Sequence, residues 1–469
     1  MKILWKPWSA KTFQQAKKEG KIVLLDISAV WCHWCHTMDR TSYSNPEVIK
    51  LVNKSFIPVK VDTDERPDVN DRYNLGGWPT TAVLSSSGHV ITGGTYIPPD
   101  KMVLFLEGAL EHSKHFQEPE IEIPTPVLAK KLASQTKTIL SSIKEAYDSE
   151  NGGFGIEPKF PQHDILEFIC SMLQRKQSAE LKRMLSNTLS TMASREIADH
   201  YGGGFYRYAT RRDWNYPHFE KMLEDNARLA ATYFKAYAIT RKKAFLETAD
   251  QALFFLLSVL YDDKGVFYAS QDADEEYCKL ELKERIKVKS PYIDKTIYTD
   301  ANAYAIRALL IAAKVLKQEK YLEMACKATD YLLKKHMTSK GMMHSTKSQI
   351  MLLKDNAQFL QTLIDVHEHT EEERYAKAAT QLAEIIVKRF SDSNGFFDIA
   401  EDKNAIGLMK IRRKVLQDNM TTARALLRLK PRAYKNIATK TLQYFSPTLD
   451  SYGPHAASYA LAYEEYRRV

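Results

Sequence analysis

Hydrophobic and polar residues follow two different periods along this chain, and the period changes near residue 116. Before that point, runs of consecutive apolar residues alternate with segments in which apolar residues recur every three or four positions. This alternation of strand and helix patterns predicts an α/β domain over residues 1–116. Strands are expected at 21–28, 56–61, 80–84 and 90–92, and helices are expected to begin at Ser9, Pro46 and Asp100.

Prolines and acidic residues dominate the next stretch, Glu118-Pro119-Glu120-Ile121-Glu122-Ile123-Pro124-Thr125-Pro126. Proline fits poorly into helices and into the interior of sheets, so the composition predicts a linker at 117–126.

From residue 127 to 469 the helical period takes over and the pattern repeats. A glycine-aromatic or glycine-apolar turn recurs, and a helix that opens on a polar residue follows each turn. The turns lie at 152–155, 202–206, 265–268, 341–344 and 395–398, with a degenerate copy at 451–454. Twelve helices are expected near 127–146, 163–175, 178–198, 218–240, 243–260, 300–316, 319–336, 354–369, 372–389, 415–429, 431–445 and 455–467.

These helices alternate in character. The segment 302–316 is almost entirely apolar, whereas 321–336 is amphipathic. An inner ring of helices shielded by an outer ring has this alternation, and one helix pair cannot bury its apolar face alone. The predicted fold is therefore multidomain, an α/β domain followed by an all-α (α/α)6 toroid of six helical hairpins.

Two cysteines, Cys32 and Cys35, stand two residues apart directly after the apolar run 22–27. A thiol at the start of a helix faces unpaired backbone N–H groups and the positive end of the helix dipole, which favour the reactive thiolate. Asp26 is an acid inside an otherwise apolar strand, where it can assist proton transfer. Pro79 precedes another apolar strand, where a cis peptide is expected, and Trp78 beside it is a candidate for substrate binding. This combination resembles a thioredoxin fold.

Other readings of Cys32-His33-Trp34-Cys35-His36 are disfavoured. Covalent haem attachment uses the same spacing but accompanies export, and Met1–Pro7 lacks the apolar core of a signal peptide. A zinc site needs about four ligands, and no second Cys-x-x-Cys pair is present. We therefore expect a redox pair, with His33 able to stabilise the Cys32 thiolate when protonated, and neither a metal nor a cofactor.

Composition excludes several classes of partner. The net charge of +9 is spread thinly over 469 residues, so no nucleic-acid surface is expected. No apolar run approaches the roughly 20 residues of a membrane span. Five cysteines, three of them far apart, do not indicate a disulfide-stapled secreted protein, so a cytoplasmic location is expected.

Eight motifs occur in an order that resembles the thioredoxin-domain family including the spermatogenesis-associated thioredoxin-like proteins. The resemblance implies a thioredoxin-like domain fused to a six-hairpin toroid akin to sugar epimerases and glycosidases. The chain departs from the family pattern at 275–280, where a glycine-aromatic continuation is replaced. The motifs are WCHWCHTM (31–38), VDTDERPD (61–68), GGWP (76–79), GGTYIP (93–98), PKFP (158–161), GGGFYRY (202–208), PHFEKMLEDN (217–226) and QDAD (271–274).

Inner-helix ends of a toroid converge on one funnel, so polar residues near those ends are candidates for ligand binding. Acids beside a histidine support acid–base chemistry, and aromatic side chains offer faces on which a sugar can stack. The competing reading is structural, since Asp and Asn cap helices and the aromatics of such turns fill cores. The candidates are Tyr206, Trp214, His218, Glu220, Asp225, Asn226, Asp272, Asp274 and Asp355, with His218, Glu220, Asp225 and Asp272 expected in one cavity.

Three hypotheses of function follow. The leading one is a thiol–disulfide oxidoreductase whose toroid binds a disulfide-bearing client protein or another ligand. The second is a carbohydrate-active enzyme, an epimerase, isomerase or hydrolase, that binds a small carbohydrate in the toroid. The third is a non-catalytic interaction protein.

Overall fold

The computed structural model describes residues 2–120 and 127–469, and the chain separates into two compact units. One comprises the described part of Met1–Thr125 together with Glu401–Arg413, and the other comprises the described part of Pro126–Ala400 together with Lys414–Val469. The expected linker at 117–126 lies mostly outside the described residues. The expected boundaries did not contain the segment 401–413 as part of the first unit.

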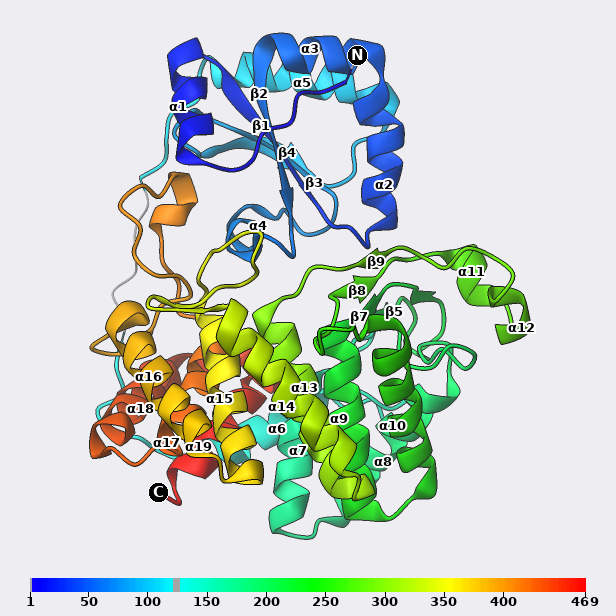
Figure 1. The fold of residues 1–469 in the computed structure, drawn as a ribbon. Helices are drawn as coiled ribbons and strands as arrows, with labels where there is room; N and C mark the ends of the chain where they lie inside the picture. The colour runs from blue at the N-terminus through cyan, green and yellow to red at the C-terminus, as the bar shows by residue number, and fades with distance from the viewer. Residues whose placement is uncertain (1, 121–126) are drawn as a thin grey trace. The chain divides into compact units, whose positions relative to one another are not determined.

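The N-terminal unit is built on a four-stranded sheet of order β2-β1-β3-β4 (Figure 1). Strand β1 runs parallel to β2 and antiparallel to β3, and β4 is the antiparallel edge strand. Helices α3 and α5 pack against each other beside the sheet. The elements are α1 (Ala10–Glu19), β1 (Ile22–Ser28), α2 (His33–Arg40), α3 (Pro46–Ser55), β2 (Phe56–Asp62), α4 (Pro67–Tyr73), β3 (Thr80–Leu84), β4 (Val90–Gly94) and α5 (Pro99–Ser113).

The segment 401–413 completes this unit by packing on α4. The hydroxyl of Tyr73 donates to the Gly88 carbonyl at 2.7 Å and accepts the Leu408 N–H at 2.9 Å. The Arg72 guanidinium donates to the Ile411 carbonyl at 2.7 Å. A Cβ atom at Gly407 would collide with the Gly88 backbone, so this close approach requires glycine.

The second unit is a closed ring of helices. Each inner helix packs against the next, and the last, α19, packs against the first, α7, which closes the ring. The inner helices are α7 (His163–Arg175), α9 (Leu223–Thr240), α13 (Thr299–Leu316), α15 (Leu353–Thr370), α17 (Leu416–Leu427) and α19 (Ala457–Tyr466). The outer helices are α6 (Thr136–Ala146), α8 (Ala179–Ser194), α10 (Lys243–Phe255), α14 (Glu319–Lys335), α16 (Glu373–Phe390) and α18 (Arg432–Phe445). The predicted toroid is confirmed.

Two helix starts differ from the expected ones. The first outer helix begins at Thr136, because the apolar residues at 127–132 belong to an irregular segment. The helix expected from 218 begins at Leu223, since Pro217–His218 and Lys221–Met222 form short strands instead. The short strands and short α-helices of this unit are β5 (Tyr208–Ala209), β6 (Pro217–His218), β7 (Lys221–Met222), β8 (Ser270–Gln271), α11 (Glu275–Lys279), α12 (Leu282–Arg285), β9 (Ile293–Asp294), β10 (Met337–Thr338), β11 (Gly341–Met342), β12 (Ser391–Asp392) and β13 (Gly395–Phe396).

A buried asparagine at the fourth position of four inner helices explains the repeating turns. In α15, Asn356 accepts the Met342 N–H at 2.8 Å and donates to the Met342 and Leu352 carbonyls at 3.3 and 2.7 Å. The side chain thus satisfies backbone groups of the preceding turn. A Cβ atom at Gly341 would meet the Asn356 oxygen, so the turn needs glycine. The same contacts join Asn226 to Phe205, Asn302 to Phe267 and Asn419 to Phe396.

Candidate functional site

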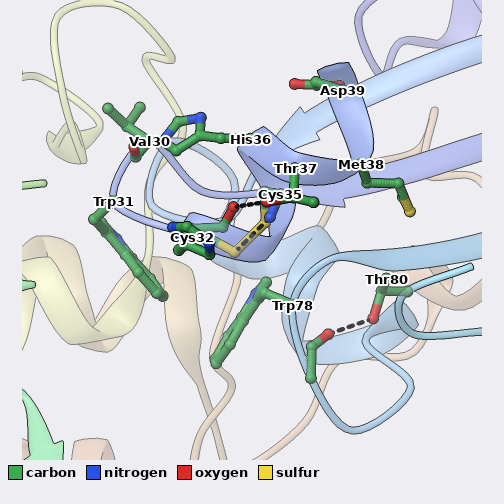
Figure 2. Close-up of a disulfide and its surroundings, with 12 residues drawn as sticks. Val30, Trp31, Cys32, Cys35, His36, Thr37, Met38, Asp39, Trp78 and Thr80 are labelled. Atoms are coloured by element: carbon green, nitrogen blue, oxygen red, sulfur yellow. Dashed lines mark hydrogen bonds between the residues drawn. A yellow bond between two sulfur atoms is a disulfide. The ribbon is translucent and has the colours of Figure 1, made fainter. Parts of the chain in front are cut away.

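The cysteine pair lies where β1 delivers the chain to the start of α2 (Figure 2). Cys32 and Cys35 form a disulfide, and the Cys32 sulfur caps the helix by accepting the Cys35 N–H at 3.2 Å. Cys32 is 7% exposed and Cys35 is 3% exposed. A sulfur that accepts a backbone N–H at a helix start is stabilised as a thiolate once the disulfide is reduced.

Asp26 lies fully buried in β1, opposite Lys60 of β2. The Lys60 ammonium lies 3.0 Å from Asp26 Oδ2 and donates to both oxygens of Asp39 at 2.7 Å. Burial raises the pKa of Asp26 to about 6, although the Lys60 charge opposes the rise. A carboxyl with that pKa exchanges its proton near neutral pH, as a proton acceptor for a thiol requires.

Aromatic side chains surround the pair. The rings of Trp31 and Trp78 meet edge to face with centroids 5.6 Å apart, and both lie beside the disulfide in Figure 2. Trp34 is 50% exposed and contacts the Tyr96 ring at 5.2 Å. The Trp78–Pro79 peptide is cis, as expected from the sequence. This region therefore offers an apolar surface next to a disulfide.

The two histidines of the motif differ in their surroundings. His33 is exposed and contacts the Trp34 ring edge to face, with centroids 5.8 Å apart. The His36 Nε2 lies 2.8 Å from the Val30 carbonyl, so this ring bridges the two ends of the loop that carries Cys32. His36 was not among the predicted site residues, although its place directly after Cys35 was visible in the sequence.

The VDTDERPD motif (61–68) contacts Trp31, which lies beside the disulfide. The Trp31 indole N–H donates to Asp64 at 2.6 Å, and Asp62 accepts the N–H groups of Asp64 and Glu65 at 2.9 and 3.0 Å. Burial and the neighbouring Asp64 charge raise the pKa of Asp62 to about 7. In the sequence this motif is visible only as a family marker, because the Trp31–Asp64 contact joins residues 33 positions apart.

Three of the candidates in the toroid are built into its core. Trp214 is fully buried and donates its indole N–H to the Asn151 carbonyl at 3.0 Å. The Tyr206 ring lies 5.2 Å from the buried Lys221 ammonium. The side chain of Asn226 is used entirely by backbone groups around Phe205. These contacts fit the structural reading of the turns and leave no group of Asn226 for a ligand.

Other candidates lie on or beside the short strands β6, β7 and β8 and the start of α11. Glu220 is buried 3.7 Å from Arg207, and burial raises its pKa to about 7 against the Arg207 charge. The His218 ring stacks on Tyr208 with centroids 4.4 Å apart. Asp272 accepts the Ala273 N–H at 2.8 Å, and Asp274 caps α11 by accepting the Tyr277 N–H at 2.9 Å.

A pocket of about 260 Å³ lies at the N-terminal ends of the inner helices, and we call it the His163 pocket. His163 opens α7, and its Nε2 lies 2.9 Å from Asp225 of α9. Burial opposes ionisation of Asp225, but His163 and nearby arginines outweigh it and lower the pKa of that carboxyl. The His163 Nδ1 is buried and has no hydrogen-bond partner among residues 2–120 and 127–469. Further lining residues are Phe160, Pro161, Gln162, Asp164, Ile165, Arg228, Gln417 and His455.

Of the four residues expected in one cavity, Asp225 lines the His163 pocket. His163, Arg228 and His455 were not predicted as site residues. His163 and His455 were recognisable in sequence as polar openings of inner helices. The His163–Asp225 pair depends on the packing of α7 against α9, and His455 reaches the same pocket because α19 packs against α7. Neither packing can be read from local spacing.

A chain of buried and partly buried charged side chains continues around the ring from this pocket. Lys354 lies 2.9 Å from Glu224 and 2.8 Å from Asp300, and the His344 Nδ1 lies 3.0 Å from Asp355. Asp300, His344 and Asp355 together have the donor types and spacing of a cation site. The Lys354 ammonium already supplies the positive charge that Asp300 needs, so this grouping is explained as an ion-pair network without a metal.

Sequence comparisons agree with this architecture. Residues 1–117 match the family described as "Protein of unknown function, DUF255". Spermatogenesis-associated protein 20 of Mus musculus is 34% identical over 304 residues, which cover 58% of this chain and 38% of the mouse protein. An uncharacterized protein of Caenorhabditis elegans is 26% identical over 84% of this chain and 73% of its own length. The resemblance to the thioredoxin-domain family is confirmed. The chain spans well under half of the mouse relative.

The toroid resembles solved structures of sugar enzymes. A sugar epimerase from a ruminal bacterium superimposes with a TM-score of 0.56 at 14% identity, covering 66% of this chain and 85% of the epimerase. Cellobiose 2-epimerase from Bacillus thermoamylovorans gives a TM-score of 0.56 at 12% identity, covering 71% and 98%. Identities this low establish a shared fold. Among the residues that the structure describes, no helix has both the length and the apolar character of a membrane span.

Proposed function

We propose that this protein is a thiol–disulfide oxidoreductase. The observation that carries the proposal is the disulfide at the start of α2, with the Cys32 sulfur on a backbone N–H, in a unit whose strand β1 holds Asp26 against Lys60. These are the parts that a dithiol needs: a stabilised thiolate, a second thiol in reach and a proton acceptor tuned by burial. The exposed Trp34 and the nearby Trp78 offer an apolar surface for a client chain.

The proposed reaction starts from the reduced pair. The Cys32 thiolate attacks one sulfur of a client disulfide, forms a mixed disulfide and releases one client thiolate, which takes a proton from solvent. Cys35 then gives its proton to the Asp26 carboxylate and attacks the Cys32 sulfur. The Cys32–client bond breaks, the second client thiol leaves with a proton, and the Cys32–Cys35 disulfide remains. Two electrons pass from the cysteine pair to the client, and the reverse sequence oxidises a dithiol client.

Reduction of insulin in the presence of a dithiol tests this proposal. Cys32→Ser is expected to abolish turnover, and Cys35→Ser is expected to trap a mixed disulfide that mass spectrometry detects. Cys326→Ser is the matched control, because Cys326 is a free thiol in the toroid, and this variant should retain full activity. Equal activity of Cys32→Ser and wild type would refute the proposal. Absence of turnover in wild type with several disulfide substrates would favour a non-catalytic interaction protein.

A second candidate function rests on the His163 pocket, namely binding of a small carbohydrate by the toroid. The pocket combines the His163–Asp225 pair, Arg228, Gln417 and His455 with the apolar Phe160 and Pro161. Hydroxyl groups of a sugar need such mixed donors and acceptors, and an apolar face accommodates its C–H surface. Structural neighbours that are sugar epimerases support this choice of ligand class.

Titration calorimetry with cellobiose and with monosaccharides tests this second function. His163→Asn is expected to weaken binding about tenfold, the effect of losing one charge-assisted hydrogen bond. The control is His115→Asn, an exposed histidine of the N-terminal unit. Sugar binding that is equal in the two variants would exclude the His163 pocket.

A further inference from the structure

A second cavity, of about 450 Å³, lies farther along the inner helices of the toroid, and we call it the C-terminal cavity. All six inner helices line it, mostly with residues from their middles and second halves. A belt of side chains stands between it and the His163 pocket. In this belt the Gln358 amide donates to the Tyr304 hydroxyl at 2.6 Å, and the Arg228 guanidinium lies 4.8 Å from the Tyr304 ring centre. The two cavities are therefore separate sites.

The acidic groups of the C-terminal cavity are all paired with arginines. Arg424 bridges Glu167 at 3.1 Å and Glu465 at 3.0 Å, and Arg428 bridges Asp365 at 2.7 Å and Glu368 at 2.8 Å. Arg307 also lies 3.0 Å from Asp365. Four side-chain carboxylates thus face five basic side chains when Lys235 and Arg468 are included.

Lys235 and Arg468 are the basic side chains outside these pairs, and Lys235 is the less exposed of the two. It lines the cavity from α9 and is half-buried, and within residues 2–120 and 127–469 its ammonium has no hydrogen-bond or ion-pair partner. Burial favours the neutral form of Glu167, but Arg424, Lys235 and Arg307 outweigh it and hold the pKa of that carboxyl below its usual range. Lys235 therefore acts on the Glu167 carboxyl through its charge, without a hydrogen bond between the two side chains.

The helix dipole does not account for Lys235. Cations stabilise the negative end of a helix only within its last turn. Lys235 stands five residues before the end of α9 at Thr240, more than a full turn away. Arg428, directly after α17, has that explanation available, and Lys235 does not.

One wall of the cavity is apolar, formed by Leu310, Ile311 and Leu427. The cavity thus offers a carbon surface and an unpaired ammonium within a volume typical of small-molecule sites. A free inorganic anion would leave the apolar wall unused, whereas an uncharged molecule would leave Lys235 unpaired. A ligand that satisfies both has a short carbon skeleton and one anionic group.

We propose that the C-terminal cavity binds a small organic oxyanion, a phosphate or carboxylate group on a short carbon skeleton, with Lys235 as its ion-pair partner and Leu310, Ile311 and Leu427 against its carbon chain. This site is independent of the cysteine pair and of the His163 pocket. Its ligand enters a part of the toroid that the redox reaction does not use.

Titration calorimetry on the full chain with butyl phosphate and with inorganic phosphate tests the proposal. Butyl phosphate is expected to bind more tightly than inorganic phosphate, because only the ester contacts the apolar wall. Lys235→Met should weaken binding of butyl phosphate about tenfold or more, since a charge-assisted hydrogen bond is lost. Lys235→Arg should largely retain it. Lys243→Met, at an exposed lysine at the start of α10, is the matched control and should bind as wild type does.

A second measurement needs no variant. Butyl phosphate should protect Lys235 from acetylation by acetic anhydride, as followed by mass spectrometry, and leave Lys243 reactive. Absence of binding to wild type at millimolar butyl phosphate would overturn the proposal. Equal binding by Lys235→Met and wild type, or equal protection of both lysines, would overturn it as well.

Discussion

A single carboxyl, Asp26, shows how burial and pairing oppose each other beneath the cysteine pair. Its position inside the apolar run 22–27 was legible in the sequence, and so was the cysteine spacing, because both are local features. Lys60 and Asp39 as its neighbours were not legible, since the pairing of β1 with β2 brings residues 34 positions apart into register. In the toroid, contacts between residues distant in sequence decided the role of even more of the candidate residues. Nothing local distinguishes a fully buried Trp214 from a platform for a sugar ring.

The raised pKa of Asp26 implies a loss of stability at neutral pH that substitution should recover. The folded protein binds a proton on this group up to about pH 6, whereas the unfolded chain releases it near 3.8. The penalty is thus absent below pH 4 and grows as pH rises through 6, to about 3 kcal/mol. Asp26→Asn should therefore raise the free energy of unfolding at pH 7 by about 2 kcal/mol. This gain is smaller than the full penalty because Lys60 loses its ion-pair partner. Near pH 3 the substitution should leave the free energy of unfolding unchanged.

Urea unfolding at several pH values measures this effect. Asp39→Asn is the control, because its carboxyl is well exposed and also contacts Lys60. A gain from Asp26→Asn that does not depend on pH would contradict the electrostatic explanation. The same variant should also slow insulin reduction if Asp26 accepts the Cys35 proton.

At the scale of helices, each glycine turn and the asparagine of the inner helix that follows it form one repeated structural motif. The sequence showed both parts of the repeat but assigned Asn226 to a ligand. The structure shows that Asn226 and its equivalents bind backbone groups of the turn. Helix periodicity located most boundaries well because the inner and outer helices keep a steady apolar face. It failed at 127–135, where apolar residues recur without forming a helix.

Loss of one such asparagine should cost more than loss of an ordinary polar residue. Asn356→Ala leaves the buried Met342 N–H and C=O without their partner, so we expect a loss of about 2–4 kcal/mol in unfolding free energy. Asn404→Ala, at an exposed asparagine, should change stability by less than about 0.5 kcal/mol. Thermal and urea unfolding give both values. Similar small effects for the two variants would show that the turns are held by packing alone.

At the scale of the whole molecule, two features could not be predicted from the sequence, because both join residues that are far apart in the chain. The packing of α7 against α9 brings His163 beside Asp225, 62 positions later. The segment 401–413 leaves the toroid portion of the chain and joins the N-terminal unit. Neither has a local signal, because each depends on which elements become neighbours after folding. The toroid itself was predictable from six repeated helix pairs, since repetition is a property of the sequence.

The hydroxyl of Tyr73 is expected to hold the segment 401–413 in place. Tyr73→Phe removes two buried hydrogen bonds, to Gly88 and Leu408, and should lower the unfolding free energy of the N-terminal unit by about 2–3 kcal/mol. It should also speed proteolytic cleavage within 401–413. Tyr96→Phe is the control, because the Tyr96 hydroxyl makes no hydrogen bond within the described residues. Unchanged cleavage in Tyr73→Phe would show that other contacts hold the segment.

The place of 401–413 in the N-terminal unit also sets an order of events during translation. Nascent domains usually fold from the N-terminus as soon as they leave the ribosome, and the ribosome adds about 5–20 residues each second. Here the first unit has to wait for residues that follow it by nearly three hundred positions, a delay of about 15–60 seconds at that rate. Throughout this interval α4 and the turn at Gly88 lack their partner, so the N-terminal unit emerges early and is completed late.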